Sequence, residues 1–154
     1  MLKQNDKINL ELSLTNINGE KVLLKQILLT KTVIYFYPKD LTPGCTTEAC
    51  EFRDYNNNII KTNTKIIGIS SDDEKSHSKF IKKHDLNFEL YSDVDHSVQE
   101  HFGVWVQKSM YGKVYMGTQR STFIVNPDGT ILKVWDKVNP EGHAKEVLDY
   151  LLSK

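Results

Sequence analysis

The sequence has no long apolar segment and no excess of either charge. Its longest purely apolar run near the centre is Val33 to Tyr37, far shorter than the ~20 residues that a membrane helix needs. The opening residues MLKQNDK contain no apolar stretch of the signal-peptide type, so we expect a cytoplasmic protein with no membrane partner. Lys and Arg total 20, as do Asp and Glu. This balance disfavours a strongly basic nucleic-acid-binding protein.

Arginine and cysteine are also scarce. Only Arg53 and Arg120 accompany 18 lysines, and the two cysteines, Cys45 and Cys50, lie five positions apart. No linker, charge block or internal repeat divides the 154 residues, of which 39% are hydrophobic and 26% charged. A chain of this length buries roughly 70% of its unfolded surface. We therefore expect residues 1–154 to form a single globular domain.

Strand and helix patterns alternate along the chain. Predicted strands cover Ile8–Leu14, Lys21–Leu24, Thr32–Tyr37, Lys65–Ser70, Phe88–Tyr91, Arg120–Asn126 and Thr130–Trp135. Predicted helices cover about 46–61, Asp72–His84, Asp95–Phe102 and a C-terminal stretch after Pro140. The Asn18-Gly19 turn between the first two strands predicts an N-terminal β-hairpin. This order predicts an α/β fold with a central mixed sheet covered by helices on both faces.

Cys45 follows a strand that is predicted to be buried, and it precedes the expected helix at 46–61. The free N–H groups and partial positive charge of a helix N-terminus favour a thiolate, which is the nucleophilic form of cysteine. Ligands of open α/β sheets also tend to bind beyond the carboxyl ends of the strands. The alternative is a small buried cysteine that packs as an apolar residue.

The residues around Cys45 read YFYPKDLTPGCTTEAC. Pro38, Thr42 and Cys45 reproduce the P-x-x-x-T-x-x-C signature, and the sequence resembles the peroxiredoxins. TPGCTTEAC, with its second cysteine, is similar to the bacterioferritin-comigratory or peroxiredoxin Q group. Further similar segments are Glu51-Phe52-Arg53, Phe102–Trp105, Lys108–Gly117 and Arg120–Phe123. The resemblance covers nearly the whole chain and implies a thioredoxin-like fold with an added N-terminal hairpin.

The resemblance assigns a role to each matching residue. It implies that Cys45 is the peroxidatic nucleophile, which attacks a hydroperoxide, releases water or an alcohol and becomes a sulfenic acid. The Thr42 hydroxyl is expected to contact the thiolate and the peroxide, and Pro38 to shield the sulfur from water. Gly44 and the N–H of Cys45 would donate to the peroxide oxygens. Arg120 would lie beside the sulfur, where a planar, permanently charged group stabilises negative charge.

Each of these residues also has a structural interpretation. Thr42 could cap a turn or helix, Pro38 could end a strand, and Arg120 could be a surface charge. We expect Arg53 to pair with an acidic residue, outside the catalytic set. Glu48 could favour the helix dipole or orient its neighbours.

Cys50 matches the resolving cysteine of the subgroup that carries it in the same helix. In an ideal helix, residues five apart have Cα atoms roughly 8–9 Å apart, whereas a disulfide tolerates at most about 7 Å. A bond between Cys45 and Cys50 therefore requires the first helical turns to unwind. A permanent structural disulfide is disfavoured on the same grounds, and by a reducing compartment.

The resemblance implies a thiol-dependent peroxidase that reduces hydrogen peroxide and organic hydroperoxides without haem, flavin or metal. It further implies recycling by thioredoxin or a similar thiol reductant through a Cys45–Cys50 disulfide, and it favours a monomer.

Four other functions compete with this interpretation of the sequence. A thioredoxin-type exchanger needs C-x-x-C, which the chain lacks. A Cys–His acyl transferase needs an oriented base, which no feature selects. A redox sensor or holdase would use the same thiol without turnover. A zinc module would combine the cysteines with two histidines, but the spacing is poor; the histidines are His77, His84, His96, His101 and His143.

Overall fold

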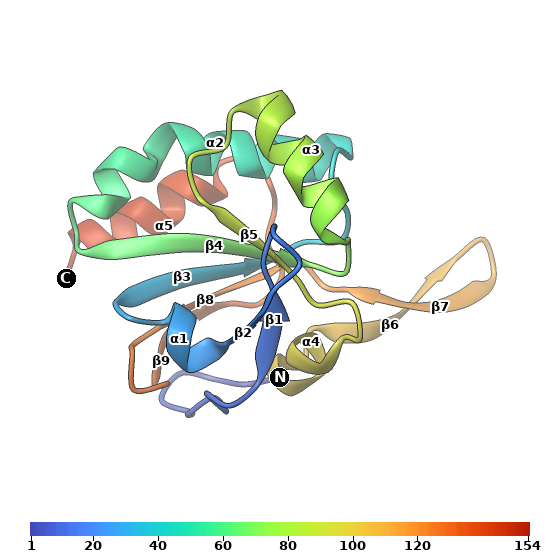
Figure 1. The fold of residues 1–154 in the computed structure, drawn as a ribbon, viewed down its shortest axis with the longest axis horizontal. Coiled ribbons are helices and arrows are strands. Elements are labelled where there is room, and N and C mark those ends of the chain that lie inside the picture. Colours follow the sequence, from blue (N-terminus) through green and yellow to red (C-terminus); the bar gives the residue numbers. More distant parts are fainter.

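The computed structural model describes all 154 residues, and a seven-stranded mixed sheet forms its centre (Figure 1). The sheet has the strand order β2-β1-β5-β4-β3-β8-β9. Its strands are β1 (Ser13–Thr15), β2 (Lys21–Leu23), β3 (Lys31–Phe36), β4 (Thr64–Ser70), β5 (Glu89–Ser92), β8 (Ser121–Val125) and β9 (Ile131–Trp135). A separate two-stranded sheet pairs β6 (Trp105–Met110) with β7 (Lys113–Thr118).

Five helices cover the two faces of the central sheet. They are α1 (Leu24–Ile27), α2 (Pro43–Ile60), α3 (Glu74–His84), α4 (Ser97–Phe102) and α5 (His143–Leu152). In Figure 1, α2, α3 and α5 lie above the sheet, and α1 and α4 lie below it. The predicted α/β architecture, with a mixed sheet between helical layers and an N-terminal β-hairpin, is confirmed.

β3 lies inside the sheet, parallel to β4 and antiparallel to β8. Its side chains alternate between two apolar cores, as the period of a strand requires. Val33 and Tyr35 pack with α2, α3 and α5, whereas Ile34 and Phe36 pack with α1 and α4. Because β3 is buried on both faces, its carboxyl end holds the segment that follows it in a fixed place.

Three predicted helices and strands begin or end at other residues in the structure than the sequence predicts. α2 begins at Pro43 rather than at residue 46, and its Pro is at the start of the helix, where a missing N–H costs nothing. The strand expected at Ile8–Leu14 is reduced to Ser13–Thr15, because the preceding residues pair elsewhere: Ile8 N–H donates to the Gly129 carbonyl. Leu24, expected at the end of the second strand, begins α1 instead.

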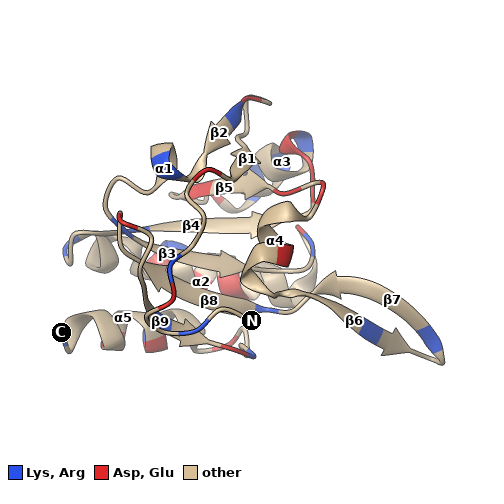
Figure 2. Ribbon diagram, turned by 90° about the horizontal axis from the view of Figure 1, so that it is seen from below, with Lys and Arg blue, Asp and Glu red and all other residues tan.

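The β6–β7 hairpin was not predicted from the sequence. It projects from the rest of the molecule in both ribbon views (Figures 1 and 2). Its turn residues Tyr111 and Gly112 both have positive φ, at 52° and 78°, as a type I′ hairpin turn requires. Most of its side chains are exposed, so it lacks the alternating apolar pattern by which half-buried strands are recognised.

Acidic and basic residues are interspersed over the elements of the fold (Figure 2). None of the helices combines the length and the apolar character required to cross a bilayer.

Candidate active site

Cys45 is the third residue of α2, directly beyond the carboxyl end of β3. Its side chain packs in the core between the sheet and α2, and the residue is 2% exposed. The backbone N–H groups of Gly44 and Cys45 have no acceptor in the protein, which is the normal condition of a first helical turn. These two donors and the helix dipole favour negative charge at this position.

Arg120 reaches Cys45 from the neighbouring strand. The antiparallel register pairs Phe36 with Ser121, so the residue before β8 lies beside the end of β3. Arg120 Nη2 donates to Cys45 Sγ at 3.4 Å. A Cβ on Gly44 would lie 3.3 Å from this Nη2, closer than most side chains tolerate, so the glycine leaves room for the guanidinium. The sequence-based expectation that Arg120 lies beside the sulfur agrees with this geometry.

Glu48 completes a three-residue chain of contacts. Arg120 Nη1 donates to Glu48 Oε1 at 2.7 Å, and the Glu48 side chain is wholly buried. Arg120 therefore uses one nitrogen on the carboxylate and the other on the sulfur, a geometry that suits its planar fork. Sequence reasoning left Glu48 outside the candidate site, although its spacing of three residues from Cys45 places both on one helix face.

Burial and neighbouring charges shift the pKa values of Arg120 and of the groups around it. Burial raises the pKa of Glu48 from 4.5 to about 7, against the opposing effect of Arg120. Burial works against the charge on Arg120, but Glu48 and Cys45 outweigh it and hold the Arg120 pKa above its usual range. Lys108 of β6 is half-buried nearby. Its pKa is lowered, mainly by burial and to a smaller extent by the positive charge of Arg120.

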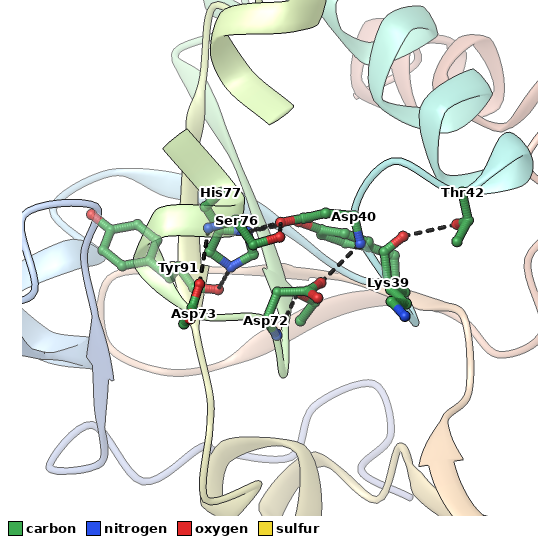
Figure 3. Close-up of polar contacts among 10 residues, drawn as sticks. Lys39, Asp40, Thr42, Asp72, Asp73, Ser76, His77 and Tyr91 are labelled. Carbon is green, nitrogen blue, oxygen red and sulfur yellow. Dashed lines mark hydrogen bonds and ion pairs between the residues drawn. The ribbon is translucent and has the colours of Figure 1, made fainter. Parts of the chain in front are cut away.

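The loop from Pro38 to Thr42 joins β3 to α2. Pro38 is exposed and lies two residues beyond Phe36, the last residue of β3. Thr42 is the N-cap residue of α2, yet its side chain makes no capping bond. Its Oγ1 donates to the Lys39 carbonyl at 2.8 Å (Figure 3) and makes no hydrogen bond with Cys45. With its proton engaged, the hydroxyl oxygen is left as an acceptor. The catalytic roles of Pro38 and Thr42 stay predictions.

Cys50 lies in the same helix as Cys45, and both are free thiols. Cys50 is half-buried and accepts a hydrogen bond from Arg53 Nη1 at 3.6 Å. The same nitrogen donates to the His84 carbonyl at 2.7 Å, and Arg53 Nε pairs with Asp54 at 3.0 Å. Arg53 thus has the acidic partner that was expected, and it also ties α2 to the end of α3.

The two buried histidines, His77 and His143, have hydrogen-bond partners of their own. His143 Nε2 contacts Thr122 Oγ1 at 2.8 Å and its Nδ1 contacts Glu146 at 2.9 Å. Both ring nitrogens of this buried residue are therefore engaged away from Cys45. His77 Nδ1 contacts Asp40 at 2.7 Å. These contacts give no support to a Cys–His acyl transferase.

The raised pKa of Glu48 predicts a pH-dependent stability. The unfolded chain releases this proton near 4.5 and the folded protein near 7, so the folded state holds the extra proton between these values. Stability of the wild type should fall as pH rises through this window, by up to about 3 kcal/mol relative to Glu48→Gln, which has no proton to release. Urea unfolding of both proteins at pH 5 and pH 8 measures this difference. A difference that is constant with pH would contradict the assignment.

Comparisons with known proteins find relatives that match nearly the whole chain. The AhpC/TSA family model matches residues 6–134. The chain is 45% identical over 141 residues to peroxiredoxin Bcp of Bacillus subtilis. The matched residues make up 92% of this chain and 90% of the relative. A structure of Xylella fastidiosa PrxQ has a TM-score of 0.92 at 35% identity and covers 99% and 97% of the two chains. Xanthomonas campestris bacterioferritin comigratory protein, described for its alkyl peroxide reduction activity, has a TM-score of 0.88 at 38% identity, with coverage of 96% and 98%.

Proposed function

The chain belongs to the AhpC/TSA family and is a peroxiredoxin, an enzyme that reduces peroxides through a cysteine thiol, and on this premise we propose that Cys45 is its peroxidatic nucleophile. The observation that carries the proposal is the hydrogen bond from Arg120 Nη2 to Cys45 Sγ at 3.4 Å. A cation and a helix N-terminus converge on one buried sulfur, and both favour the thiolate.

The proposed reaction begins with loss of the thiol proton from Cys45. The thiolate attacks one oxygen of the hydroperoxide, an S–O bond forms and the O–O bond breaks. The leaving oxygen carries negative charge and takes up a proton, which yields water or an alcohol. Arg120 and the free N–H groups of Gly44 and Cys45 are positioned to stabilise this developing charge. The products are a sulfenic acid on Cys45 and a reduced peroxide.

We propose hydrogen peroxide and organic hydroperoxides as substrates. Attack on a thiol that is 2% exposed favours an oxidant whose reacting group is as small as a hydroperoxide. The alkyl peroxide reduction described for the Xanthomonas campestris protein supports the organic class. Thioredoxin, or a similar thiol reductant, is the proposed electron donor.

A coupled assay tests the proposed function. Purified protein, peroxide, thioredoxin, thioredoxin reductase and NADPH are mixed, and NADPH oxidation is followed with hydrogen peroxide or an alkyl hydroperoxide. We expect turnover with both peroxides, and its complete dependence on Cys45. Sulfenic acid formation without turnover would leave the first step intact and exclude thioredoxin as the donor. A redox sensor would give that result.

We propose Cys50 as the resolving cysteine, whose thiol condenses with the sulfenic acid and releases water. Cys50→Ser should still reduce one equivalent of peroxide, because Cys45 is unchanged. Thioredoxin-driven turnover should then fall sharply, and excess peroxide should convert Cys45 to the sulfinic acid. Mass spectrometry of the treated variant measures the product. Full thioredoxin-supported turnover with no oxidised Cys45 would remove Cys50 from the mechanism.

Formation of this disulfide requires α2 to open. Cα atoms five residues apart in a helix are roughly 8–9 Å apart, beyond the about 7 Å that a disulfide tolerates. The later part of α2 is held by Phe52 and Ile59, which are fully buried, so we expect only its first turns to unwind. Local opening of a helix end costs far less than global unfolding.

Amide exchange measures this opening. Oxidation should speed exchange over residues 43–53 and leave α5 unchanged. An intramolecular Cys45–Cys50 bond with unchanged exchange over that segment would contradict the unwinding.

The single-domain organisation, the monomeric state and the cytoplasmic location stay predictions. Limited proteolysis tests the first, light scattering the second and cell fractionation the third.

A further inference from the structure

The loop that leads to Cys45 is attached to α3 by a buried carboxylate. Asp40 lies midway between Pro38 and Thr42, and its side chain is only 1% exposed. Buried carboxylates are uncommon unless partners satisfy them. The position of Asp40 in a surface loop therefore calls for an explanation beyond the packing of the core.

Asp40 is anchored from several elements at once (Figure 3). Its Oδ1 accepts from the Tyr37 hydroxyl at 2.6 Å. Its Oδ2 accepts from Ser76 Oγ at 2.8 Å and contacts His77 Nδ1 at 2.7 Å, both on α3. The backbone N–H of Asp40 donates to Asp72 Oδ2 at 2.8 Å. Side chain and backbone of this one loop residue are thus both fixed to the β4–α3 region.

His77 is the rigid end of this anchor. It is completely buried, and its Nε2 lies 3.0 Å from the Tyr91 carbonyl. A carbonyl oxygen can only accept, so Nε2 carries hydrogen and donates. The imidazole is therefore held by β5 on one side and presents Nδ1 to Asp40 on the other.

The backbone directly after Asp40 needs such an anchor. Leu41 has φ of 64°, a left-handed conformation that is strained for a side chain with a Cβ. Leu41 is also 42% exposed, so its own packing does little to hold it. Thr42 and Cys45 follow within four residues, and their placement depends on this turn.

We propose that Asp40 and His77 are positioning residues of the peroxidase reaction: they clamp the β3–α2 loop to α3 and so hold the first turn of α2 in its reactive geometry. This inference rests on the proposed role of Cys45. It assigns neither residue a direct contact with peroxide. Misplacement of a reacting group by about 1 Å can cost about a hundredfold in rate, so a loosened anchor should be visible in the first chemical step.

Two variants of His77 separate the anchor from general packing. An Asn amide nitrogen can take the place of Nδ1 and keep the bond to Asp40, whereas a Gln amide nitrogen can take the place of Nε2 and keep only the bond to Tyr91. His77→Asn should retain sulfenic acid formation within about threefold of the wild type, and His77→Gln should lose at least about tenfold, as misplacement predicts. Asp40→Ala, which removes both carboxylate oxygens and so every side-chain bond of the anchor, should lose as much as His77→Gln.

Asp93→Asn is the matched control. Asp93 is another buried carboxylate, 2% exposed, and it accepts from the backbone N–H groups of Val98 and Gln99 in α4. Its loss should lower thermal stability while the rate of sulfenic acid formation stays within about threefold, because α4 does not hold the loop. Melting temperatures of all four variants are measured together with the rates.

The alkylation of Cys45 by iodoacetamide gives a second readout. Removal of negative charge at Asp40 would, through charge alone, favour the thiolate and shift the pH midpoint of alkylation downward. Loss of positioning shifts it upward, because the sulfur leaves its N–H donors and Arg120. We expect the upward shift in Asp40→Ala and His77→Gln. This assay uses no peroxide, so it tests the anchor even if wild-type Cys45 forms no sulfenic acid, which would reject the proposed function alone.

Three outcomes would overturn the proposal. One is a wild-type rate in Asp40→Ala. Another is an equal loss of rate in His77→Asn and His77→Gln, accompanied by a similar loss of rate in Asp93→Asn at a similar melting temperature. The third is a downward alkylation midpoint in the two anchor variants. If Asp40→Ala does not fold, the two His77 variants decide the question by the same criteria.

Discussion

Cys45→Ser is expected to abolish peroxide reduction while the protein stays folded. A serine hydroxyl is not ionised at neutral pH and lacks the nucleophilicity of sulfur. Arg120 and the helix N-terminus remain in place, but they have no thiolate to stabilise. We expect the rate of peroxide consumption to fall by at least about a thousandfold, to the uncatalysed background, as removal of a nucleophile does in other enzymes.

The measurement is a single-turnover assay of peroxide consumption, with circular dichroism to confirm the fold. The oxygen of serine is smaller than sulfur and Cys45 is buried, so a modest change in stability is expected. Cys50→Ser serves as the control, because it removes the other thiol and should keep the first turnover. Retention of more than a few per cent of the peroxide-reducing rate in Cys45→Ser would place the nucleophile elsewhere.

Much of the fold could be predicted because its signals are local. The short apolar run of β-branched and aromatic residues that forms β3, and the apolar stripe that repeats at helical spacing in α5, each identify a buried element from adjacent residues. The β8–β9 hairpin follows from Pro127-Asp128-Gly129, since turn chemistry is a property of a few adjacent residues. These elements match the structure to within a few residues at their ends.

The elements that were missed depend on distant partners. The residues before β1 contain enough apolar side chains to resemble a strand, but Ile8 hydrogen-bonds with Gly129, and Leu24 packs into the second core as part of a helix. Long-range tertiary contacts of this kind override the local secondary-structure propensity. The β6–β7 hairpin was missed because its side chains face solvent, and an exposed strand carries no hydrophobic pattern.

Some residues of the candidate site could likewise be predicted from the sequence, and others could not. Cys45 and Arg120 could be named from the motif and from the scarcity of arginine, and their sulfur–nitrogen contact agrees with that choice. Glu48 could not be ranked, because the helix predicted at 46–61 placed it in the first turn, where an acid is favourable on an exposed surface too. Only its complete burial and its bond to Arg120 distinguish it. Asp40 and His77 are 37 positions apart, so no local pattern connects them.

Arg120→Lys is expected to slow the reaction with peroxide by about a hundredfold, the order of loss that follows removal of one donor to a developing anion. The substitution keeps the charge but removes the fork. Arg120 donates from Nη1 to Glu48 and from Nη2 to Cys45, and a single ammonium cannot reproduce two directed bonds of this geometry. Glu48 and Cys45 are both buried, but a carboxylate is a much stronger hydrogen-bond acceptor than sulfur, so leaving Glu48 without a partner costs more.

The lysine ammonium is therefore expected to bond with Glu48 and to leave Cys45 without its side-chain donor. The second-order rate constant of sulfenic acid formation, measured in single turnover, tests this expectation. Arg53→Lys is the matched control: the same exchange is made in the chain's other arginine, on α2, where it bonds with Asp54 and the His84 carbonyl, and the first step should keep its rate. Wild-type rates in Arg120→Lys would mean that charge alone suffices, and that the two-pronged contact of the guanidinium has no part in catalysis.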